Sequence, residues 1–548
     1  MDSCNNVGQL LASSARNWPD HPAIAEPSAS GWKSISFSEL DRQTDSIAAR
    51  LRARSVQPGT RLALLVPAGI EFVKYVFGLA KARVVTILID PGMNRDNLIQ
   101  CMSDAQPEGF VGIRKAHLAR LLYRKHFPLA KKNFIVGSRF FPGCKRLDQP
   151  LAKSIDDSEY DSADEAAVIF TTGSTGPSKG VLYTQGNFVR QAFEIRDYFE
   201  IPPGGADISG FPLFALFNSA MGKTTVFPEM DFTRPAEAEP DNIIDAVEHW
   251  QADQLFGSPA LLNRLGQYCE SNRIRLTTVK RVLSAGAPVP PHVLRRMKGV
   301  ISTDGDVYTP YGATEALPVA CNSASVVMQE TEQITNRGGG TCVGGRFEGI
   351  NWQVIQITDE PIEQMQQAAI LKPGEIGELI VQGPVVTRRY VTRTDANSLH
   401  KIVDGEKFWH RMGDVGYFDE QDRFWMCGRK SHRVVTAEGT LFTVPCEAIF
   451  NSHPSIYRSA LVGIGPDQAR TPVIVAEPWP EFWREDPEEQ GQLIAELIQL
   501  AKCSVVTNSI ERILLRQKLP TDIRHNSKIF REQLVGWATE RVANRDNE

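Results

Sequence analysis

The chain has 548 residues, of which 42% are hydrophobic and 23% are charged. This composition excludes a disordered or collagen-like chain, and the length exceeds that of one ordinary domain, so about two or three domains are expected. The formal net charge of −5 gives no reason to expect a nucleic-acid partner.

The cysteines and the N-terminal residues are typical of a cytoplasmic protein. The nine cysteines form no CxxC pair and no zinc-binding spacing, so reduced thiols are expected. The first residues lack a basic segment followed by an apolar one, so no secretory signal is expected. The most apolar region, 61–89, is interrupted by charged residues such as Glu71 and Lys74 and is not expected to cross a membrane.

The first predicted elements alternate between helix and strand. Ser38 precedes a helical pattern that carries Leu40 on its apolar face. Residues 62–66 then form a short apolar run of strand length, residues 69–82 have helical spacing, and residues 84–89 form a second apolar run. Strand, helix and strand in this order predict a parallel sheet covered by helices.

Similar elements recur further along the chain. Residues 166–170 predict a strand, which is followed by a Gly-rich loop and then by a helix that carries Phe188 and Ala192. Residues 376–382 predict an isolated β segment. The C-terminal part is predicted to contain strands at 460–464 and 473–477, an acidic surface loop at 481–490 and a helix at 492–500.

The Gly-rich loop has the residue types of a phosphate-binding loop. In chain order they are Thr171, Thr172, Gly173, Ser174, Thr175, Gly176, Pro177, Ser178, Lys179 and Gly180. Glycines let the backbone wrap closely around an anion, hydroxyl and backbone N–H groups donate to phosphate oxygens, and Lys179 adds positive charge. The loop is not a Walker A motif, because Gly180 rather than Ser or Thr follows Lys179.

The segment TTGSTGPSKGV (171–181) resembles the phosphate-loop signature of the adenylate-forming superfamily, which comprises acyl-CoA synthetases, adenylation domains and luciferases. Further segments resemble motifs of this superfamily in the same order, so the resemblance covers nearly the whole chain. They are SAGAP (284–288), YGATE (311–315), GDVG (413–416), CGRK (427–430) and DIRHNSKIFR (522–531).

The resemblance implies a site for ATP and Mg²⁺. Thr314, Glu315 and Lys528 would be catalytic, and Glu315 would also contact Mg²⁺, which prefers oxygen and phosphate ligands. Tyr311 would stack on the adenine. The other implied ATP contacts are Thr171, Thr172, Gly173, Ser174, Thr175 and Lys179 in the phosphate loop, Gly286, Ala287, Pro288 and Gly312 near the adenine, and Asp414 and Arg429 at the ribose.

The resemblance also implies the fold. We expect an α/β protein with a β-barrel, in which residues 1–430 form a large N-terminal adenylation domain of mixed sheets. Residues 431–548 would form a small α+β C-terminal lid domain that brings Lys528 to the site. The joint is expected near Lys430 and Ser431.

Several strings resemble the β-lactone synthetases of bacterial long-chain olefin biosynthesis more closely than other members. Among them are FPLFALFNSAMG (211–222), TPYGATEALPVA (309–320) and HRMGDVGYFD (410–419). The resemblance implies a ligase that adenylates a long-chain 2-alkyl-3-hydroxy fatty acid with ATP. The β-hydroxyl of this acid would then displace AMP and close a lactone. Association with other enzymes of the olefin pathway is left open.

Departures from the acyl-CoA ligase pattern favour this reading. Ala215 replaces the histidine of a PLxH string, and Met412 replaces a threonine before Gly413. The segment 436–443 also differs from the loop with which ligases shape a pantetheine tunnel. The alternative is a long-chain acyl-CoA or acyl-carrier ligase. A third possibility is a nucleotide-binding scaffold without catalysis, against which the retained motif residues argue.

Two features are left open by the sequence. Ring closure needs a group that takes a proton from the hydroxyl, and His410, His432 and His525 lie beside motif residues. The apolar segment 211–217, read as a loop, lines the acyl pocket or belongs to the core.

Overall fold

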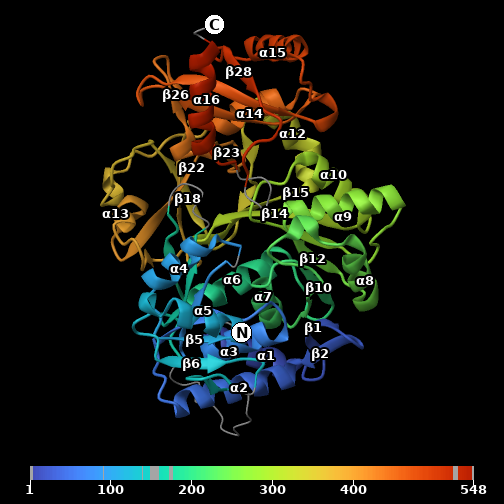
Figure 1. Cartoon of the computed structure of the whole chain (residues 1–548), viewed down its shortest axis with the longest axis vertical. Helices are drawn as coiled ribbons and strands as arrows, with labels where there is room; N and C mark the ends of the chain where they lie inside the picture. Colours follow the sequence, from blue (N-terminus) through green and yellow to red (C-terminus); the bar gives the residue numbers. More distant parts are fainter. Residues whose placement is uncertain are drawn as a thin grey trace. The chain divides into compact units, whose positions relative to one another are not determined.

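The computed structural model describes residues 4–90, 92–138, 140–147, 160–171, 177–521 and 529–545. The chain divides into two compact units that interleave along the sequence. The first unit comprises Met1–Val319, Phe347–Asn351 and Gln382–Lys401, and the second comprises Ala320–Arg346, Trp352–Val381 and Ile402–Glu548. Figure 1 labels the elements of both units.

A mostly parallel eight-stranded sheet lies in the first unit. Leu62 of β3 pairs in parallel with Thr86 of β4, which confirms the predicted strands at 62–66 and 84–89 and their parallel arrangement. All four residues of β4 are buried, as expected for a strand covered on both faces. In spatial order the strands are β20 (Arg389–Tyr390), β9 (Gly180–Thr184), β8 (Glu165–Phe170), β4 (Val85–Leu88), β3 (Arg61–Leu65), β5 (Gly109–Gly112), β6 (Lys132–Ile135) and β7 (Lys145–Arg146).

A second sheet of the first unit has a parallel centre and an antiparallel edge formed by β1 and β2. Its strands from β14 through β13, β12, β10 and β11 to β1 run parallel. In spatial order they are β15 (Ala316–Ser323), β14 (Asp306–Ala313), β13 (Arg281–Ser284), β12 (Gln254–Gly257), β10 (Ala206–Ser209), β11 (Thr224–Val226), β1 (Pro22–Ser28) and β2 (Gly31–Ser36).

Several helices of the first unit bury their apolar faces in one large core, and α4 buries its apolar residues in a second, smaller cluster. The predicted helix at 69–82 is confirmed as α3, whereas α2 begins before Ser38. The hydroxyl of Ser36 accepts a hydrogen bond from the Glu39 N–H and caps α2, so Ser38 lies inside the helix. The helices are α1 (Val7–Asn17), α2 (Phe37–Ala53), α3 (Ile70–Lys81), α4 (Arg95–Asp104), α5 (Arg114–Leu122), α6 (Gln185–Tyr198), α7 (Phe214–Met221), α8 (Pro240–Trp250), α9 (Pro259–Asn272), α10 (Pro291–Val300) and α13 (Ala396–His400).

The second unit contains a mostly antiparallel six-stranded sheet. The resemblance to the adenylate-forming superfamily implied a β-barrel, and this sheet is the corresponding component. The predicted segment at 376–382 is confirmed as β19, but it is not isolated, because it pairs with β22 and β18. The strands are β16 (Thr341–Cys342), β23 (Phe424–Arg429), β22 (Lys407–Phe418), β19 (Gly377–Gln382) and β18 (Asn351–Ile355), with β21 (Lys401–Asp404) beside β22. At the end of β15, Ala320 and Cys321 pair with β17 (Gly345–Arg346).

The C-terminal part of the second unit is a small α+β arrangement. The predicted strands at 460–464 and 473–477 and the helix at 492–500 are confirmed as parts of β26, β27 and α15. The elements are β24 (Val434–Val435), β25 (Thr440–Leu441), β26 (Ile456–Ile464), β27 (Thr471–Pro478), β28 (Arg512–Leu515), α14 (Thr443–Asn451), α15 (Pro487–Lys502) and α16 (Arg531–Arg545), and the short helices α11 (Ala324–Val326) and α12 (Glu332–Asn336) precede them in the unit.

The predicted acidic loop at 481–490 is wrong in its second half. Asp486 accepts hydrogen bonds from the N–H groups of Glu488 and Glu489, so α15 begins at Pro487 with two acidic residues in its first turn. Acidic residues stabilise a helix N-terminus, which is why an apparently solvated acidic segment folds as a helix start.

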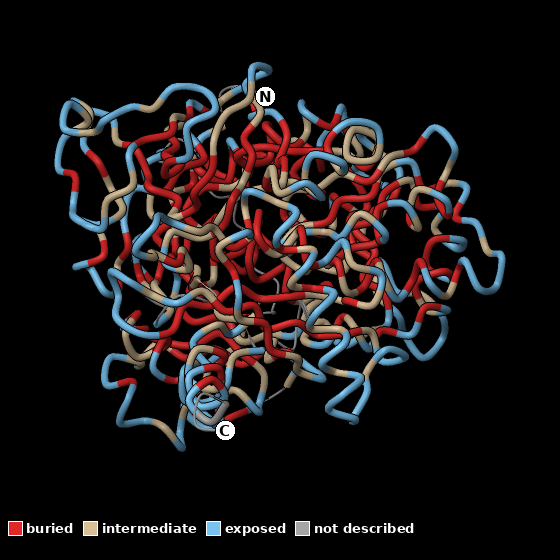
Figure 2. The backbone as a smooth tube through the Cα atoms, turned by 90° about the horizontal axis from the view of Figure 1, so that it is seen from above, coloured by how far each residue is buried: buried red, intermediate tan, exposed pale blue. Residues whose placement is uncertain are grey.

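Figure 2 shows buried backbone toward the interior and exposed backbone in the outer loops. In the described part of the chain, no helix combines the length and apolar character that a membrane crossing needs.

Candidate active site

The phosphate-loop segment closes a β-hairpin. β8 and β9 are antiparallel, with Phe170 opposite Gly180. The Thr171 N–H donates to the Lys179 carbonyl, and the Lys179 N–H donates to Thr171 Oγ1, both at 3.0 Å. Thr172, Gly173, Ser174 and Thr175 lie outside the described residues.

The predicted order of strand, loop and helix at this segment is wrong, because β9 stands between the loop and α6. The apolar and β-branched residues of β9 continue the sheet, and Thr184 then caps α6 with its hydroxyl. The two described ends of the loop are tied by reciprocal hydrogen bonds, and a strand rather than a helix N-terminus follows it.

Lys179 stands at the base of this hairpin. Its Nζ lies 3.2 Å from His400 Nε2 and 5.1 Å from the centre of the Tyr390 ring. The next residue, Gly180, donates its N–H to Thr392 Oγ1 at 2.7 Å. The base of the phosphate loop is therefore held against the segment that contains β20.

Thr314 and Glu315 occupy the turn between β14 and β15. A Cβ at Gly312 would lie 2.6 Å from the Ala316 carbonyl oxygen, so the tight approach of these two strands requires glycine. The Tyr183 hydroxyl donates to the Thr314 carbonyl at 2.5 Å. The turn is thus fixed from both sides, with Thr314 half-buried and Glu315 almost fully buried.

The Glu315 side chain is held by a phenol. The Tyr390 hydroxyl donates to Glu315 Oε1 at 2.6 Å. Thr387 donates its N–H and its hydroxyl to the Glu315 carbonyl at 2.8 and 3.0 Å. Among the residues that the structure describes, no hydrogen bond or ion pair reaches the second carboxylate oxygen, Oε2.

Lys401 completes this cluster. Its Nζ donates to the Thr387 carbonyl at 2.5 Å and lies 5.8 Å from the centre of the Tyr390 ring. Burial lowers the pKa of Lys401 to about 7, against the attraction of Glu315, which acts to raise it. No sequence motif marks Tyr390, Thr387 or Lys401, so the sequence does not predict them.

The loop expected near the adenine follows β13. Leu283 of β13 is the parallel partner of Tyr308 of β14, so Gly286 and Tyr311 both lie three residues beyond this pair at the carboxyl ends of neighbouring strands. Gly286 has a φ of +94°, while Ala287 is half-buried and Pro288 exposed. Ligands of open parallel sheets bind at such carboxyl ends. The structure therefore places Tyr311 and the loop together.

In the second unit, Asp414 and Arg429 are opposite each other in the antiparallel pair β22–β23. Arg429 Nη1 donates to Asp414 Oδ1 at 2.7 Å and to the Met412 carbonyl at 3.2 Å. Met412, which replaces a ligase threonine, accepts this bond through its backbone carbonyl, which any residue would supply, and its side chain is buried. Lys528 lies outside the described residues.

At the expected interdomain joint, Lys430 belongs to a buried charge network. Its Nζ lies 3.1 Å from Glu378 Oε2, and Arg411 Nη2 donates to the same oxygen at 2.6 Å. Burial lowers the pKa of Lys430, and Glu378 opposes this effect. One carboxylate therefore holds two cations at this point of the chain.

The three histidines considered for ring closure differ in their surroundings. Burial, together with the nearby charges of Arg531 and Arg429, lowers the pKa of His432 to about 4. An imidazole with so low a pKa is a weak proton acceptor at neutral pH. His410 is buried on β22, and His525 lies outside the described residues.

The apolar segment 211–217 is not a loop, because α7 begins at Phe214. Ala215 is fully buried in the main core of the first unit, and Phe214 stacks on Phe256 with ring centres 4.5 Å apart. The part of 211–217 that includes Ala215 is therefore core in this structure.

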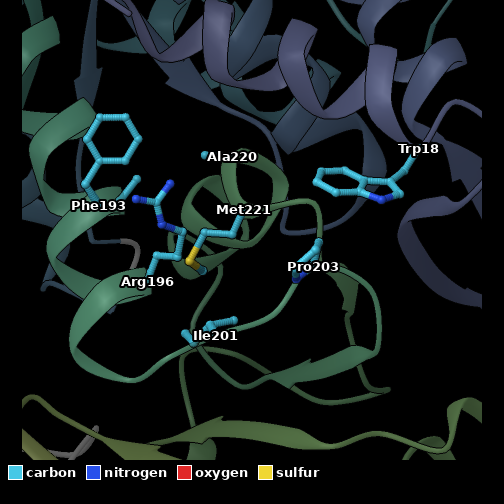
Figure 3. Close-up of a pocket in the computed structure, with 8 residues that line it drawn as sticks. Trp18, Phe193, Arg196, Ile201, Pro203, Ala220 and Met221 are labelled. Atoms are coloured by element: carbon cyan, nitrogen blue, oxygen red, sulfur yellow. The ribbon is translucent and has the colours of Figure 1, made fainter. Parts of the chain in front are cut away.

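A cavity of about 180 Å³ lies at the opposite end of α7. Figure 3 shows Phe193 and Arg196 of α6 facing Met221 of α7, with Trp18 on the other side. Arg196 is paired with Asp197 at 2.7 Å, and most of the lining is apolar. Typical small-molecule pockets measure roughly 300–1,000 Å³, so this cavity is too small for a nucleotide.

Carboxylate oxygens are the protein groups that decide whether this site can hold Mg²⁺. In the described part of the chain, no three His, Cys, Asp or Glu side chains gather as a metal cage. Mg²⁺ is commonly bound by one or two carboxylates together with substrate phosphates and water. Glu315, fixed through one oxygen beside the base of the phosphate-loop hairpin, fits this mode.

Comparison with known proteins identifies the family. The model of the AMP-binding enzyme family matches residues 11–391, and the chain belongs to this family. It is similar to the olefin beta-lactone synthetase of Xanthomonas campestris pv. campestris, at 40% identity over 98% of both chains. It is also similar to the olefin beta-lactone synthetase of Stenotrophomonas maltophilia, at 39% identity over 98% of this chain and 99% of the relative.

Solved structures share the fold. An amide bond synthetase from Marinactinospora thermotolerans has a TM-score of 0.77 at 19% identity, and the match covers 97% of this chain and 99% of that protein. An o-succinylbenzoate coenzyme A synthetase from Bacillus subtilis, solved with ATP and magnesium ion, has a TM-score of 0.72 at 18% identity, over 96% and 98% of the chains. These likenesses confirm the α/β fold class expected from the sequence.

Proposed function

We propose that this enzyme is an ATP-dependent β-lactone synthetase that acts on a long-chain 2-alkyl-3-hydroxy fatty acid. The observation that carries the proposal is the 40% identity, over 98% of both chains, to an olefin beta-lactone synthetase. The geometry at Thr314, Glu315, Asp414 and Arg429 supports the adenylation half of the reaction.

In the first step, a carboxylate oxygen of the acid attacks the α-phosphorus of ATP and pyrophosphate leaves. The hairpin loop with Lys179 binds the phosphates, and Thr314 lies at the adjoining turn. Bound Mg²⁺ would neutralise phosphate charge, and Glu315 supplies the carboxylate for it. We assign to Lys528 the positive charge that stabilises the transition state at the α-phosphate.

The nucleoside is assigned to two sets of residues. Tyr311 offers a ring face for the adenine beside the loop of Gly286, Ala287 and Pro288. Asp414 accepts hydrogen bonds from ribose hydroxyls, and Arg429 orients its carboxylate. These residues recognise neutral groups of ATP, whereas Lys179 and Glu315 respond to its charge.

In the second step, the 3-hydroxyl oxygen attacks the activated carbonyl carbon and AMP leaves with the bonding electrons. The hydroxyl proton passes to a base, and the four-membered ring closes. Because the nucleophile is part of the substrate, its proximity to the carbonyl replaces a second substrate. No thiol has to reach the adenylate.

The segment 436–443 supports this assignment. It contains a closed hairpin turn in which Thr436 Oγ1 accepts the N–H groups of Glu438 and Gly439, while the Thr436 N–H donates to the Gly439 carbonyl at 2.8 Å. The turn satisfies its own polar groups. Its sequence departs from the ligase loop that shapes a thiol tunnel.

We also propose the domain boundaries and the role of each domain. Residues 1–430 form the adenylation domain and residues 431–548 the lid that carries Lys528, with the buried Lys430–Glu378 contact at the joint. The nine cysteines with no CxxC pair favour a cytoplasmic location. Association with other enzymes of an olefin pathway belongs to the same proposal.

Product analysis by mass spectrometry tests the function. The purified enzyme receives ATP, Mg²⁺ and a long-chain 2-alkyl-3-hydroxy acid, with and without CoA. We expect β-lactone, AMP and pyrophosphate in equal amounts, independent of CoA. The matched acid without the hydroxyl should stall as the adenylate or hydrolyse slowly. Conversion of that plain acid to a CoA thioester faster than lactone forms would instead establish a ligase.

A further inference from the structure

Tyr390 contacts both charged groups of the candidate site residues in the first unit. Its hydroxyl donates to Glu315 Oε1 at 2.6 Å. Its ring lies within cation–π distance of Lys179, at 5.1 Å, and of Lys401, at 5.8 Å. One side chain therefore contacts the carboxylate assigned to Mg²⁺ and the lysine at the base of the phosphate loop.

The position of this phenol is fixed by the backbone around it. Tyr390 is the antiparallel partner of Val181 in the strand pair β20–β9, so it is tied to the hairpin that carries the phosphate loop. Its N–H donates to Asn397 Oδ1 at 2.8 Å, and only 1% of the residue is exposed. A buried and paired ring cannot rotate away, so the Tyr390 hydroxyl sets the rotamer of Glu315.

The charge of the group that donates to Glu315 affects the carboxylate as much as the position of that group does. A phenol is a neutral donor, so it fixes one carboxylate oxygen and leaves the negative charge of Glu315 in place. A guanidinium or ammonium at the same point would neutralise that charge. The carboxylate therefore stays oriented and able to attract a cation.

We propose that Tyr390 is a positioning residue, which orients Glu315 for the metal ion of a metal–ATP complex and couples it to Lys179. The inference rests on the proposed function only in taking metal–ATP as the ligand. Tyr390 acts through Glu315 and does not itself touch the reacting atoms.

The test measures metal binding without turnover. Free Mn²⁺ is titrated by electron paramagnetic resonance in the presence of a non-hydrolysable ATP analogue, for the parent and for Tyr390→Phe. Loss of a hydrogen bond to a charged group should raise the half-saturating Mn²⁺ concentration roughly tenfold or more. Phenylalanine keeps the ring, so packing and the contacts of both lysines with the ring face remain.

Tyr160→Phe is the matched control. Tyr160 is also buried, and its hydroxyl donates to the Lys81 carbonyl at 3.0 Å, remote from Glu315 in sequence and in contacts. This variant should lose a similar hydrogen bond and some thermal stability while its Mn²⁺ titration stays like that of the parent. In a Glu315→Gln background, Tyr390→Phe should add little further loss.

Each result bears on the proposal. Weaker Mn²⁺ binding by Tyr390→Phe, with adenylation restored at high Mg²⁺, supports it. A parent-like Mn²⁺ titration of the folded variant overturns it, whatever happens to stability. If the parent enzyme itself binds no metal–ATP complex, both the proposed function and the role of Tyr390 are wrong. If the parent binds the complex and the Tyr390→Phe titration is parent-like, only the role of Tyr390 is wrong.

Discussion

Glu315 and Asp414 are two carboxylates of the candidate site with similar burial, at 9% and 3% exposure, and with donors of different charge. Glu315 accepts from the neutral phenol of Tyr390, whereas Asp414 accepts from the guanidinium of Arg429. The donor to Glu315 therefore carries no charge, whereas Asp414 forms an ion pair with its donor.

This difference in donor charge supports the two different ligands that we propose for these carboxylates. A buried carboxylate beside a neutral donor retains a strong attraction for a cation, at the cost of desolvation. A carboxylate already paired with a guanidinium has little attraction left for a cation, but its remaining lone pairs accept from neutral hydroxyls. Glu315 therefore suits Mg²⁺, and Asp414 suits a ribose.

Removing Lys528 should reduce activity more than any other proposed substitution. It also sharpens the comparison of Glu315 with Asp414, because neither carboxylate can replace the positive charge of Lys528. Lys528→Ala should lower the rate of adenylate formation roughly 100-fold or more, as loss of a transition-state donor does. Both carboxylates would still hold ATP, so ATP binding should remain near that of the parent. Pyrophosphate release and equilibrium ATP binding are the two measurements. Parent-like pyrophosphate release would show that this lysine is misassigned.

Asp414→Asn tests whether the two carboxylates are functionally distinct. The change keeps the shape but removes the partner charge of Arg429, and the KM for ATP should rise roughly tenfold. The defect should not be relieved by extra Mg²⁺. The variant should also discriminate less than the parent between ATP and its 2′-deoxy analogue. For Glu315→Gln we expect the opposite pattern, a defect that depends on Mg²⁺.

Asp419→Asn is the matched control for this experiment. Asp419 also pairs with a guanidinium, that of Arg423, at 2.8 Å in the same antiparallel hairpin. Loss of the Asp419 carboxylate should change the free energy of unfolding and leave the KM for ATP unchanged. A defect of Asp414→Asn that high Mg²⁺ abolishes would remove the distinction between the two carboxylates.

Local sequence pattern was sufficient to predict part of the scaffold of the first unit. The helix α3 and the strands β3 and β4 have strong periodicity or continuous apolar runs, and the sequence predicts each to within a few residues. The strand β9 was missed because five residues after a Gly-rich loop carry too little pattern to separate a strand from a helix start. The helical turn at Phe214 was missed for a similar reason.

Residues of the site could be predicted only where they belong to contiguous motifs. Asp414 and Arg429 are motif residues, and strand pairing brings them together. Tyr390 is 75 residues from Glu315, and their contact arises from the pairing of β20 with β9. A contact made by long-range sheet register leaves no local signal, so the hydrogen-bond partner of the carboxylate that we assign to Mg²⁺ became visible only in the fold.

The smallest expected effect concerns the pH response of Lys401, the buried lysine near Glu315. Lys401 lies near Glu315, and burial lowers its pKa to about 7, whereas a guanidinium such as that of Arg429 keeps its charge throughout. An unfolded lysine keeps its proton to about pH 10, so between pH 7 and 10 the unfolded chain binds more protons than the folded one. Folding stability attributable to Lys401 therefore rises with pH in that window.

Lys401→Met removes this titration. Without ATP or metal, the variant should be more stable than the parent near pH 6.5, and its advantage should shrink toward pH 10, by less than the limit of about 1.4 kcal/mol per pH unit for one proton. Denaturant unfolding across this range measures the difference. The same change at the exposed Lys407 should give a difference that does not vary with pH. An advantage of Lys401→Met that is constant or grows with pH would mean that Lys401 stays charged beside Glu315, and the charge contrast between the two carboxylates would then be weaker than we infer.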